Sequence, residues 1–177
     1  MGSRTHFDHD SKQADRFAPQ SLASPAEHLA RLEIGHARAR DLPAVARMQR
    51  RAFPPRLAYT LSTLVLLWVL PWVRLLVARR DGKIVGCVIG DRVLEGSRII
   101  NLAVEPAARG QGIGAALLYA AEDALPVGDM TLMVQSGNTA ARALYRRVGY
   151  EDESENPNYY GPGRPGVWMR KRRGALR

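Results

Sequence analysis

The sequence predicts an α/β domain with a mixed, mostly antiparallel sheet of six to seven strands and helices on both faces. Apolar segments of strand length alternate along the chain with segments whose apolar residues recur at helical spacing. Two apolar runs flank Asp81-Gly82, which is a strong hairpin signal. A nearly continuous apolar run from Ser97 to Val104 is typical of a strand at the centre of a sheet.

The segment before these strands predicts one edge strand and one helix. Residues 33–41 alternate polar and apolar side chains well enough for a strand at the edge of the sheet. Asp41 is placed to act as the N-cap of the next helix, with Pro43 in its first turn. Pro54-Pro55 then ends that helix.

An uncharged run from Leu57 to Val73 follows and predicts a buried amphipathic helix to about Leu70. The run is at the short limit for crossing a bilayer, and Pro71 shortens the usable helix further. A membrane span is therefore not favoured. Contact with a membrane surface or with a second copy remains open, so the chain is expected to be a monomer or a homodimer.

The second half of the chain predicts two helices and three further strands, in the order helix, strand, helix, strand, strand. The first helix presents one apolar face, and it is followed by a short strand at 130–135 and a second helix across 138–150. The last strand is expected at 166–171. The expected apolar faces comprise Ile113, Leu117, Leu118, Ala121 and Leu125 on the first helix and Ala141, Leu144, Tyr145 and Val148 on the second.

Length and composition indicate one globular domain at residues 31–172 of the 177, with a disordered or tag-like tail at 1–30 and a basic tail at 173–177. Lys and Arg number 26 against 17 Asp and Glu, a net charge of +9 that favours anionic partners. Cys87 is the single cysteine, which excludes an internal disulfide and suits a buried core position. The histidines lie near the front of the chain without metal-ligand spacing, so no metal is expected. An export signal is not visible, and a cytoplasmic location is expected.

The stretch "RGQGIGA" at 109–115 stands between the central strand and an Ala- and Leu-rich helix. Glycines let a ligand approach the backbone, and the free N–H groups of a first helical turn attract anions. The spacing matches neither the dinucleotide-binding fingerprint nor a Walker loop. A pyrophosphate-binding turn is the functional interpretation, and a merely flexible turn is the structural alternative.

The segment "NLAVEPAARGQGIGAALL" together with "GNTAARALYRRVGY" resembles the two acetyl-CoA motifs of the GNAT (Gcn5-related N-acetyltransferase) superfamily. The resemblance extends from about Glu33 to Lys171 and implies a GNAT fold, with a sheet splayed at its centre and acetyl-CoA in the gap. It also implies a donor site in which Tyr145 protonates the leaving thiolate. The cofactor-binding residues that it implies are Leu102, Ala103, Val104, Arg109, Gly110, Gln111, Gly112, Ile113, Gly114, Ala115, Asn138, Arg142 and Tyr145.

The C-terminal segment "NPNYYGPGRPGVWMRK" and the segment "RRAFPP" resemble the RimI-like branch, which acetylates the N-terminal amines of ribosomal proteins. The resemblance implies that Tyr159 and Tyr160 cover a peptide groove whose other wall includes Phe53 and Pro54. A protein or peptide N-terminus, ribosomal proteins included, is then the expected acceptor, and DNA is not an expected partner. A turn followed by a strand is the structural alternative for the tyrosines.

One position departs from that branch. Met133 stands where the branch carries an acidic residue or a histidine, and a thioether cannot accept a proton. An α-amine, with a pKa of about 8, is already partly neutral at neutral pH, whereas a lysine amine is not. Glu105 is the first candidate for a water-linked base, and Glu151 and Asp152 are others.

Two alternative functions remain open. One is acetylation of a small-molecule amine or a protein lysine by the same chemistry. The other is an acyl-CoA-binding module without catalysis. Basic residues at Arg142, Arg146 and Arg147 are candidates for binding the 3′-phosphate of the coenzyme, and the basic C-terminal tail is a candidate for contact with ribosomal RNA.

Overall fold

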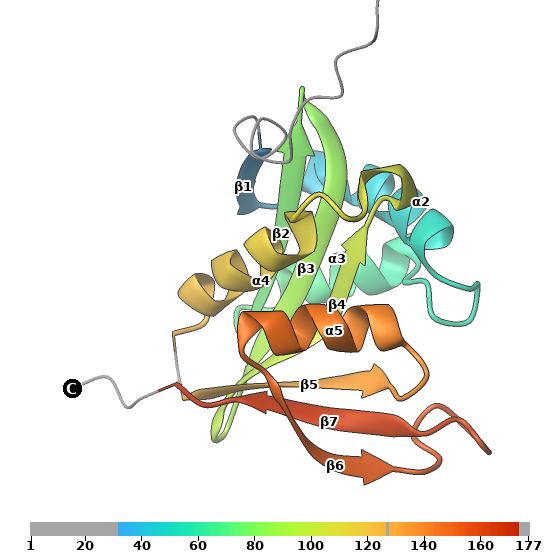
Figure 1. Cartoon of the computed structure of the whole chain (residues 1–177). Coiled ribbons are helices and arrows are strands. Elements are labelled where there is room, and N and C mark those ends of the chain that lie inside the picture. Colours follow the sequence, from blue (N-terminus) through green and yellow to red (C-terminus); the bar gives the residue numbers. More distant parts are fainter. Residues whose placement is uncertain (1–31, 127, 174–177) are drawn as a thin grey trace, which may run out of the picture.

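The computed structural model describes residues 32–126 and 128–173, and the order of its elements confirms the order expected from the sequence (Figure 1). The predicted tail at 1–30 and most of the basic tail lie outside the described residues. The elements are β1 (Leu32–His36), η1 (Ala39–Asp41), α2 (Leu42–Ala52), α3 (Leu61–Val69), β2 (Val73–Arg80), β3 (Lys83–Val93), β4 (Gly96–Val104), η2 (Pro106–Ala108), α4 (Ile113–Ala124), β5 (Asp129–Gln135), α5 (Thr139–Val148), β6 (Glu151–Asn156) and β7 (Gly166–Lys171).

Within the described residues, seven strands form one mixed sheet in the order β1-β2-β3-β4-β5-β7-β6. The β4–β5 pair is parallel, and the other neighbouring pairs are antiparallel. The Asp81-Gly82 turn joins β2 to β3 with both residues at positive φ, 50° and 72°, as a two-residue hairpin loop requires. The strand predicted to be central is β4, fourth in the order.

The sheet opens between β4 and β5. Their pairing begins at Gly96↔Asp129 and ends at Ile99↔Leu132, although β4 continues to Val104 and β5 to Gln135. A register shift in the β3–β4 pairing, between Ile89 and Gly90, bends β4 where the separation begins. The expected splay is therefore present, and the facing edges of the two strands are available to a ligand.

Helices cover the sheet on both faces and bury two separate cores (Figure 1). The apolar stripes of α4 and α5 pack on one face, where Leu117 and Leu118 are fully buried. On the other face α2 and α3 cover β2, β3 and β4, with Val45 and Leu64 fully buried. The apolar face predicted for the helix after the glycine turn is confirmed, since all five of its residues are buried.

Two details of the front half differ from expectation. Asp41 does not cap α2 with its side chain, because its carboxylate accepts bonds from the Arg38 backbone N–H at 2.6 Å and from Arg79 at 2.5 Å. It closes a short 3₁₀ turn and ties that turn to β2 instead. The predicted edge strand accordingly ends at His36.

The prediction of a buried helix from Leu57 to about Leu70 was wrong in extent and in burial. The helix α3 begins only after Thr60, whose hydroxyl accepts the Thr63 N–H as an N-cap. Leu64 is its one buried residue, and the outer side chains are exposed. Helical spacing identified an apolar helix, but the helix is apolar on every side and only one side meets the sheet.

Candidate active site

The glycine turn between β4 and α4 has the geometry of an anion site. Gly110 and Gly112 adopt left-handed backbone conformations with φ of 76° and 80°, which favour glycine. Gly112 is the N-cap of α4, and the Ala116 N–H donates to its carbonyl. The N–H groups of residues 113–115 therefore precede the first helical bond and remain available to a negatively charged ligand.

Side chains on both flanks hold this turn in place. The Arg109 guanidinium donates to the backbone carbonyls of Val104 and Ala52, at 3.4 and 3.1 Å, and so ties the turn to β4 and α2. Gln111 accepts a bond of 2.6 Å from Arg80 at the end of β2. The Nε and Nη2 atoms of Arg80 are buried without a partner in the described part of the chain, which adds positive charge beside the turn. These features fit a pyrophosphate group.

The opening of the sheet continues this site toward α5. Leu102, Ala103 and Val104 lie on the part of β4 that has left β5. Asn138 caps α5 by accepting the Ala141 N–H at 3.1 Å, and its side-chain nitrogen makes no bond within the described residues. Several of the residues that the sequence predicts to bind acetyl-CoA thus lie along the splayed edge of β4 and at the starts of α4 and α5. An elongated ligand with a polar arm and an anionic group suits this arrangement.

Tyr145 is buried on the inner face of α5, at the side of the sheet where α4 also packs. Its ring lies 5.9 Å from that of Tyr150. Burial raises the pKa of the Tyr145 hydroxyl well above its ordinary value, and the nearby Tyr160 raises it further. The hydroxyl is therefore protonated throughout the neutral range and able to donate a hydrogen bond.

The carboxylates considered as bases are held by arginines. Both Glu105 oxygens accept bonds of 2.8 Å from Arg51, and those bonds lower the pKa of Glu105 despite partial desolvation. Burial raises the pKa of Asp152, but bonds from Arg146 and Arg142 outweigh this effect and lower it overall. A lowered pKa makes each carboxylate a weaker proton acceptor. The role of Glu105 stays a prediction that this geometry does not favour.

Two of the three arginines predicted near the coenzyme phosphate are already engaged. Arg142 bonds Asp152 at 2.5 Å and the Ser136 carbonyl at 3.1 Å, and Arg146 bonds Asp152 at 2.6 Å. Arg147 is exposed on the same helix and has no ion pair among the described residues. Of these arginines, Arg147 can turn toward a phosphate without breaking an existing pair.

An aromatic cluster lies on the opposite side of the opening from the glycine turn. Tyr159 packs edge-on against Tyr160 at 5.0 Å and against Trp168 at 6.2 Å, and the Tyr160 hydroxyl donates to the Met133 carbonyl at 3.2 Å. Burial raises the pKa of Tyr160 to about 12, and Tyr159 and Tyr59 contribute to the shift. Burial also raises the pKa of Tyr59 in the α2–α3 loop, and Tyr159 adds to that rise.

The C-terminal tyrosines were predicted from the sequence, whereas Tyr59 and Trp168 were not. Phe53 packs in the core beneath α2, and Pro54 is exposed. Their assignment to the facing wall stays a prediction. Trp168 could not be assigned from the sequence, because only the paired fold of β6 and β7 brings it to Tyr159.

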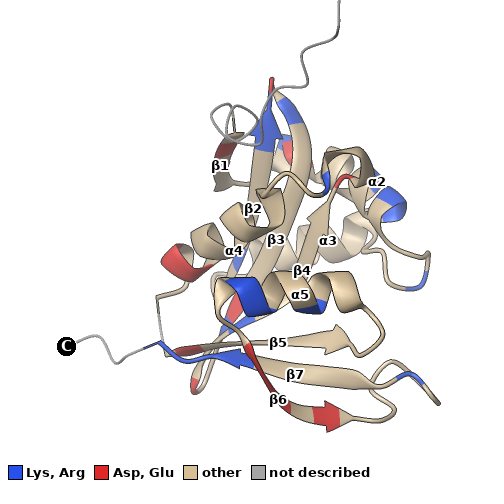
Figure 2. Cartoon of the chain, in the orientation of Figure 1, with Lys and Arg blue, Asp and Glu red and all other residues tan. Residues whose placement is uncertain are grey.

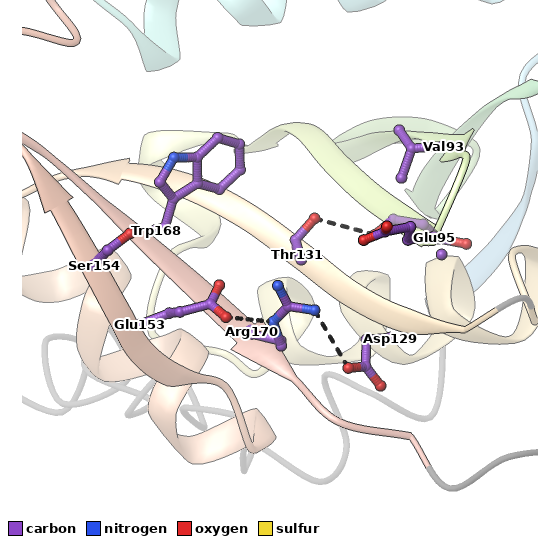
Figure 3. Close-up of a pocket in the computed structure, with 10 residues that line it drawn as sticks. Val93, Glu95, Asp129, Thr131, Glu153, Ser154, Trp168 and Arg170 are labelled. Carbon is purple, nitrogen blue, oxygen red and sulfur yellow. Dashed lines mark hydrogen bonds and ion pairs between the residues drawn. The ribbon is translucent and has the colours of Figure 1, made fainter.

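An open depression of about 290 Å³ adjoins this cluster through Trp168 (Figure 3). Figure 3 shows Arg170 between Glu153 and Asp129, which it contacts at 2.7 and 3.5 Å. The other residues that line it are Val93, Glu95, Gly96, Ser97, Thr131 and Ser154. The sequence did not indicate this feature, because its lining is contributed by five strands and the β3–β4 turn.

Two further groups bear on the chemistry. Burial raises the pKa of Cys87 to about 12, so its thiol is not an activated nucleophile. Among residues 32–126 and 128–173, no group of three His, Cys, Asp or Glu side chains is placed to hold a metal ion.

Known proteins are similar to this chain in sequence and in fold. The sequence model of the acetyltransferase (GNAT) domain matches residues 71–152. An uncharacterized N-acetyltransferase of Methanocaldococcus jannaschii is 34% identical over 138 residues, covering 76% of this chain and 87% of that protein. The chain belongs to the GNAT acetyltransferase family. It is accordingly an N-acetyltransferase, and acetyl-CoA is its acyl donor.

Other relatives of this acetyltransferase include the ribosomal protein bS18-alanine N-acetyltransferase of Escherichia coli. That protein is 36% identical over 84 residues, which cover 46% of this chain and 57% of its own length. The crystal structure of the E. coli ribosomal-protein-S18-alanine N-acetyltransferase superposes with a TM-score of 0.71 at 26% identity, covering 82% of this chain and 98% of that one. A Thermoplasma acidophilum N-acetyltransferase in complex with coenzyme A shares the fold, with a TM-score of 0.71 at 17% identity over 80% of this chain and 99% of that chain.

Proposed function

We propose that this acetyltransferase modifies the α-amine of a protein or peptide N-terminus. The observation that carries the proposal is the aromatic cluster of Tyr159, Tyr160 and Trp168, set beside the end of the β4–β5 pairing. Tyrosine and tryptophan side chains contribute apolar contact area together with a polar group that can reach a peptide backbone. The similarity to the bS18-alanine N-acetyltransferase of E. coli supports the same acceptor class.

In this proposal the donor side is held by the main chain. Backbone groups of Leu102–Val104 bind the pantetheine arm along the free edge of β4, and Asn138 contacts it from α5. The N–H groups of residues 110–115 hold the pyrophosphate, while the Arg109 N–H already donates to the Pro106 carbonyl. When bound, acetyl-CoA supplies the thioester carbonyl carbon that the acceptor amine attacks.

The chemical step forms a C–N bond and breaks the C–S bond without a covalent enzyme intermediate. The Tyr145 hydroxyl donates its proton toward the departing thiolate and regains one from solvent. The attacking nitrogen loses its extra proton to water. Most of the rate comes from holding the two reactants in contact in the right orientation.

The acceptor has to arrive as a neutral amine, because Met133 cannot take a proton and Glu105 and Asp152 are paired with arginines. An α-amine has a pKa of about 8, and a lysine amine one of about 10.4, so far more of the α-amine is neutral at pH 7. This difference favours N-terminal amines over lysine side chains.

The direct test is a peptide panel incubated with acetyl-CoA and read by mass spectrometry. The peptides differ in their first two residues, contain an internal lysine, and are each paired with a copy whose N-terminus is formylated. Acetyl groups on free N-termini alone, with no product from formylated copies, support the proposal. Acetyl-lysine in both sets contradicts it.

A small cationic amine is the second candidate acceptor. It is favoured by the three carboxylates, Glu95, Asp129 and Glu153, that line the depression next to Trp168. Carboxylates in one concave site attract a cation, although Arg170 neutralises part of their charge. A panel of polyamines and aminoglycosides under the same conditions distinguishes this acceptor, since turnover with them and none with peptides reverses the assignment.

A further inference from the structure

The outer side of α3 is an apolar surface that nothing in the described structure covers. It is formed by Leu61, Val65, Leu66 and Val69 of α3 and by Trp72 just after it, which are 43%, 42%, 59%, 58% and 50% exposed. We propose that this surface, called the α3 face below, docks the enzyme on an anionic lipid membrane.

The α3 face is not needed to hold the helix in place. Leu64 is fully buried under α3, and the Trp68 indole donates to the Ala37 carbonyl at 2.9 Å. These inner contacts anchor α3 to the sheet. Contiguous apolar side chains left in water on the opposite side are a cost that a monomer rarely retains without a binding role.

The adjacent β3–β4 turn extends this apolar surface. The Arg92 N–H donates to the Trp72 carbonyl at 3.1 Å, which places the turn beside the α3 face. Val93 is 39% exposed and Leu94 is entirely exposed at the tip of the turn. A protruding leucine next to a half-exposed tryptophan matches what interfacial membrane binding requires, because tryptophan favours the headgroup level.

The charges along α3 and its flanks favour an anionic partner, and Glu95 in the adjoining turn is a negative charge that opposes this. The chain carries no Asp or Glu from Leu42 to Arg80, and α3 itself carries no charge (Figure 2). Arg56 and Arg74 flank the helix, and neither forms an ion pair in the part of the chain that the structure describes. Arginines around an apolar surface attract the negative headgroups of a lipid leaflet.

Arg74 is placed to bind a headgroup next to the apolar residues. It borders an open cleft of about 360 Å³ whose lining also includes Trp68 and Val69. Its guanidinium donates to the backbone carbonyls of Pro71 and Val73, at 2.8 and 3.1 Å. Those bonds fix its position without neutralising its charge.

A second copy of the chain suits the α3 face less well. A two-fold contact through α3 would bring the arginines that flank one helix close to those of its partner, in a chain of net charge +9. A lipid leaflet presents the opposite charge to the same residues. The helix would lie in the plane of the leaflet, since no helix in the described ranges is long and apolar enough to cross a membrane.

Docking through α3 leaves the donor site accessible. α3 packs on the sheet face opposite to that of α4, whose first turn carries the proposed anion site (Figure 1). Membrane contact therefore changes where the enzyme acts without closing its acetyl-CoA site.

The test uses the full chain and two kinds of vesicles, phosphatidylcholine alone and phosphatidylcholine with about 30% phosphatidylserine. We expect co-sedimentation with the anionic vesicles at least ~10-fold tighter than with the neutral ones, and weaker at high salt. The double variant Leu66→Gln/Val69→Gln is expected to reduce binding at least ~5-fold, because it removes apolar area but no charge.

The control is Tyr119→Gln, which removes an exposed aromatic side chain from α4 on the opposite side of the sheet. It should bind the anionic vesicles as the parent chain does, and both variants should keep the parent's turnover of a soluble acceptor. Absence of binding to anionic vesicles overturns the proposal. So does a dimer in sedimentation equilibrium that Leu66→Gln/Val69→Gln converts to monomer, because the α3 face would then join two copies.

Discussion

At the scale of single residues, the proposed chemistry depends on the hydroxyl of Tyr145. Replacing it by phenylalanine keeps the buried ring and removes only the proton donor. We expect Tyr145→Phe to lower kcat by about 100-fold, within the range for loss of a general acid, with little change in the affinity for acetyl-CoA. Steady-state kinetics with a reactive peptide, together with calorimetric binding of coenzyme A, measures both quantities.

Tyr150→Phe is the matched control for this change. Tyr150 is buried beside Tyr145, and the same single oxygen is removed, but the Tyr150 hydroxyl is near Glu122 and Arg173 rather than Tyr160. Its kcat should stay within about 3-fold of the parent enzyme, since no catalytic proton is lost. Equal losses in the two variants would assign Tyr145 a purely structural role.

The dependence of rate on pH follows from the residues that surround the acceptor. A neutral amine is the nucleophile, so raising the pH increases the reactive fraction, and kcat/KM for an α-amine should rise through about pH 8 and then level off. Burial keeps Tyr145 protonated, because it raises the pKa of that hydroxyl, so no decline is expected below about pH 10. Values of kcat/KM measured from about pH 6 to about pH 10 test both the expected rise and the expected absence of a decline.

A rise centred well below the pKa of the acceptor amine would reveal a protein base. Repeating the pH series with the Glu105→Gln variant tests whether Glu105 is that base. The parent and this variant should give the same midpoint if Glu105 only holds Arg51.

At the scale of helices and strands, local chemistry made most of the fold predictable. The Asp81-Gly82 pair specified the β2–β3 hairpin because few residues tolerate positive φ at two successive positions. The spacing of apolar residues identified α4 and its buried face, because apolar side chains at helical spacing lie on one side of a helix. The burial of α3 was mispredicted because a helix that is apolar all round carries no periodic signal of which side meets the sheet.

The turn before α4 allows a sharp test at this scale. Gly112 has φ of 80°, and an alanine there would adopt a conformation that costs about 1–2 kcal/mol. We expect Gly112→Ala to lower the stability by about that amount and to weaken coenzyme A binding about 10-fold, since the N–H groups of the first turn would be displaced. Urea unfolding and isothermal titration calorimetry measure the two effects.

Gly35→Ala serves as the comparison for this variant. A side chain at Gly35 meets no atom within 4 Å, and the residue lies on the edge strand β1 with no positive φ. Stability and coenzyme binding should both remain close to those of the parent. Unchanged coenzyme binding in Gly112→Ala would rule out the turn as the pyrophosphate site.

At the scale of the whole molecule, the sequence could not reveal which distant segments meet. The splay of β4 from β5 was expected only from the family resemblance. The pairing ends at Ile99↔Leu132, and neither strand has a local sequence pattern that marks this end. The Tyr160 hydroxyl reaches the Met133 carbonyl across 27 residues of chain, a hydrogen bond decided by tertiary packing. Met133, by contrast, was a sequence observation, and the structure adds that its carbonyl accepts the Tyr160 hydroxyl.

The charge of the whole molecule also has a measurable consequence for the donor. A chain of net charge +9 attracts the phosphates of acetyl-CoA, and dissolved salt screens that attraction over about 8 Å at physiological ionic strength. We therefore expect the KM for acetyl-CoA to rise several-fold from low to high salt, at about 0.05 and 0.5 M, while kcat stays constant. Acetyl-pantetheine, which has the same thioester and no phosphate, is the matched donor, and its KM should be insensitive to salt. An equal salt effect on both donors would mean that salt acts on the acceptor or on the fold, and not on the phosphates held at the start of α4.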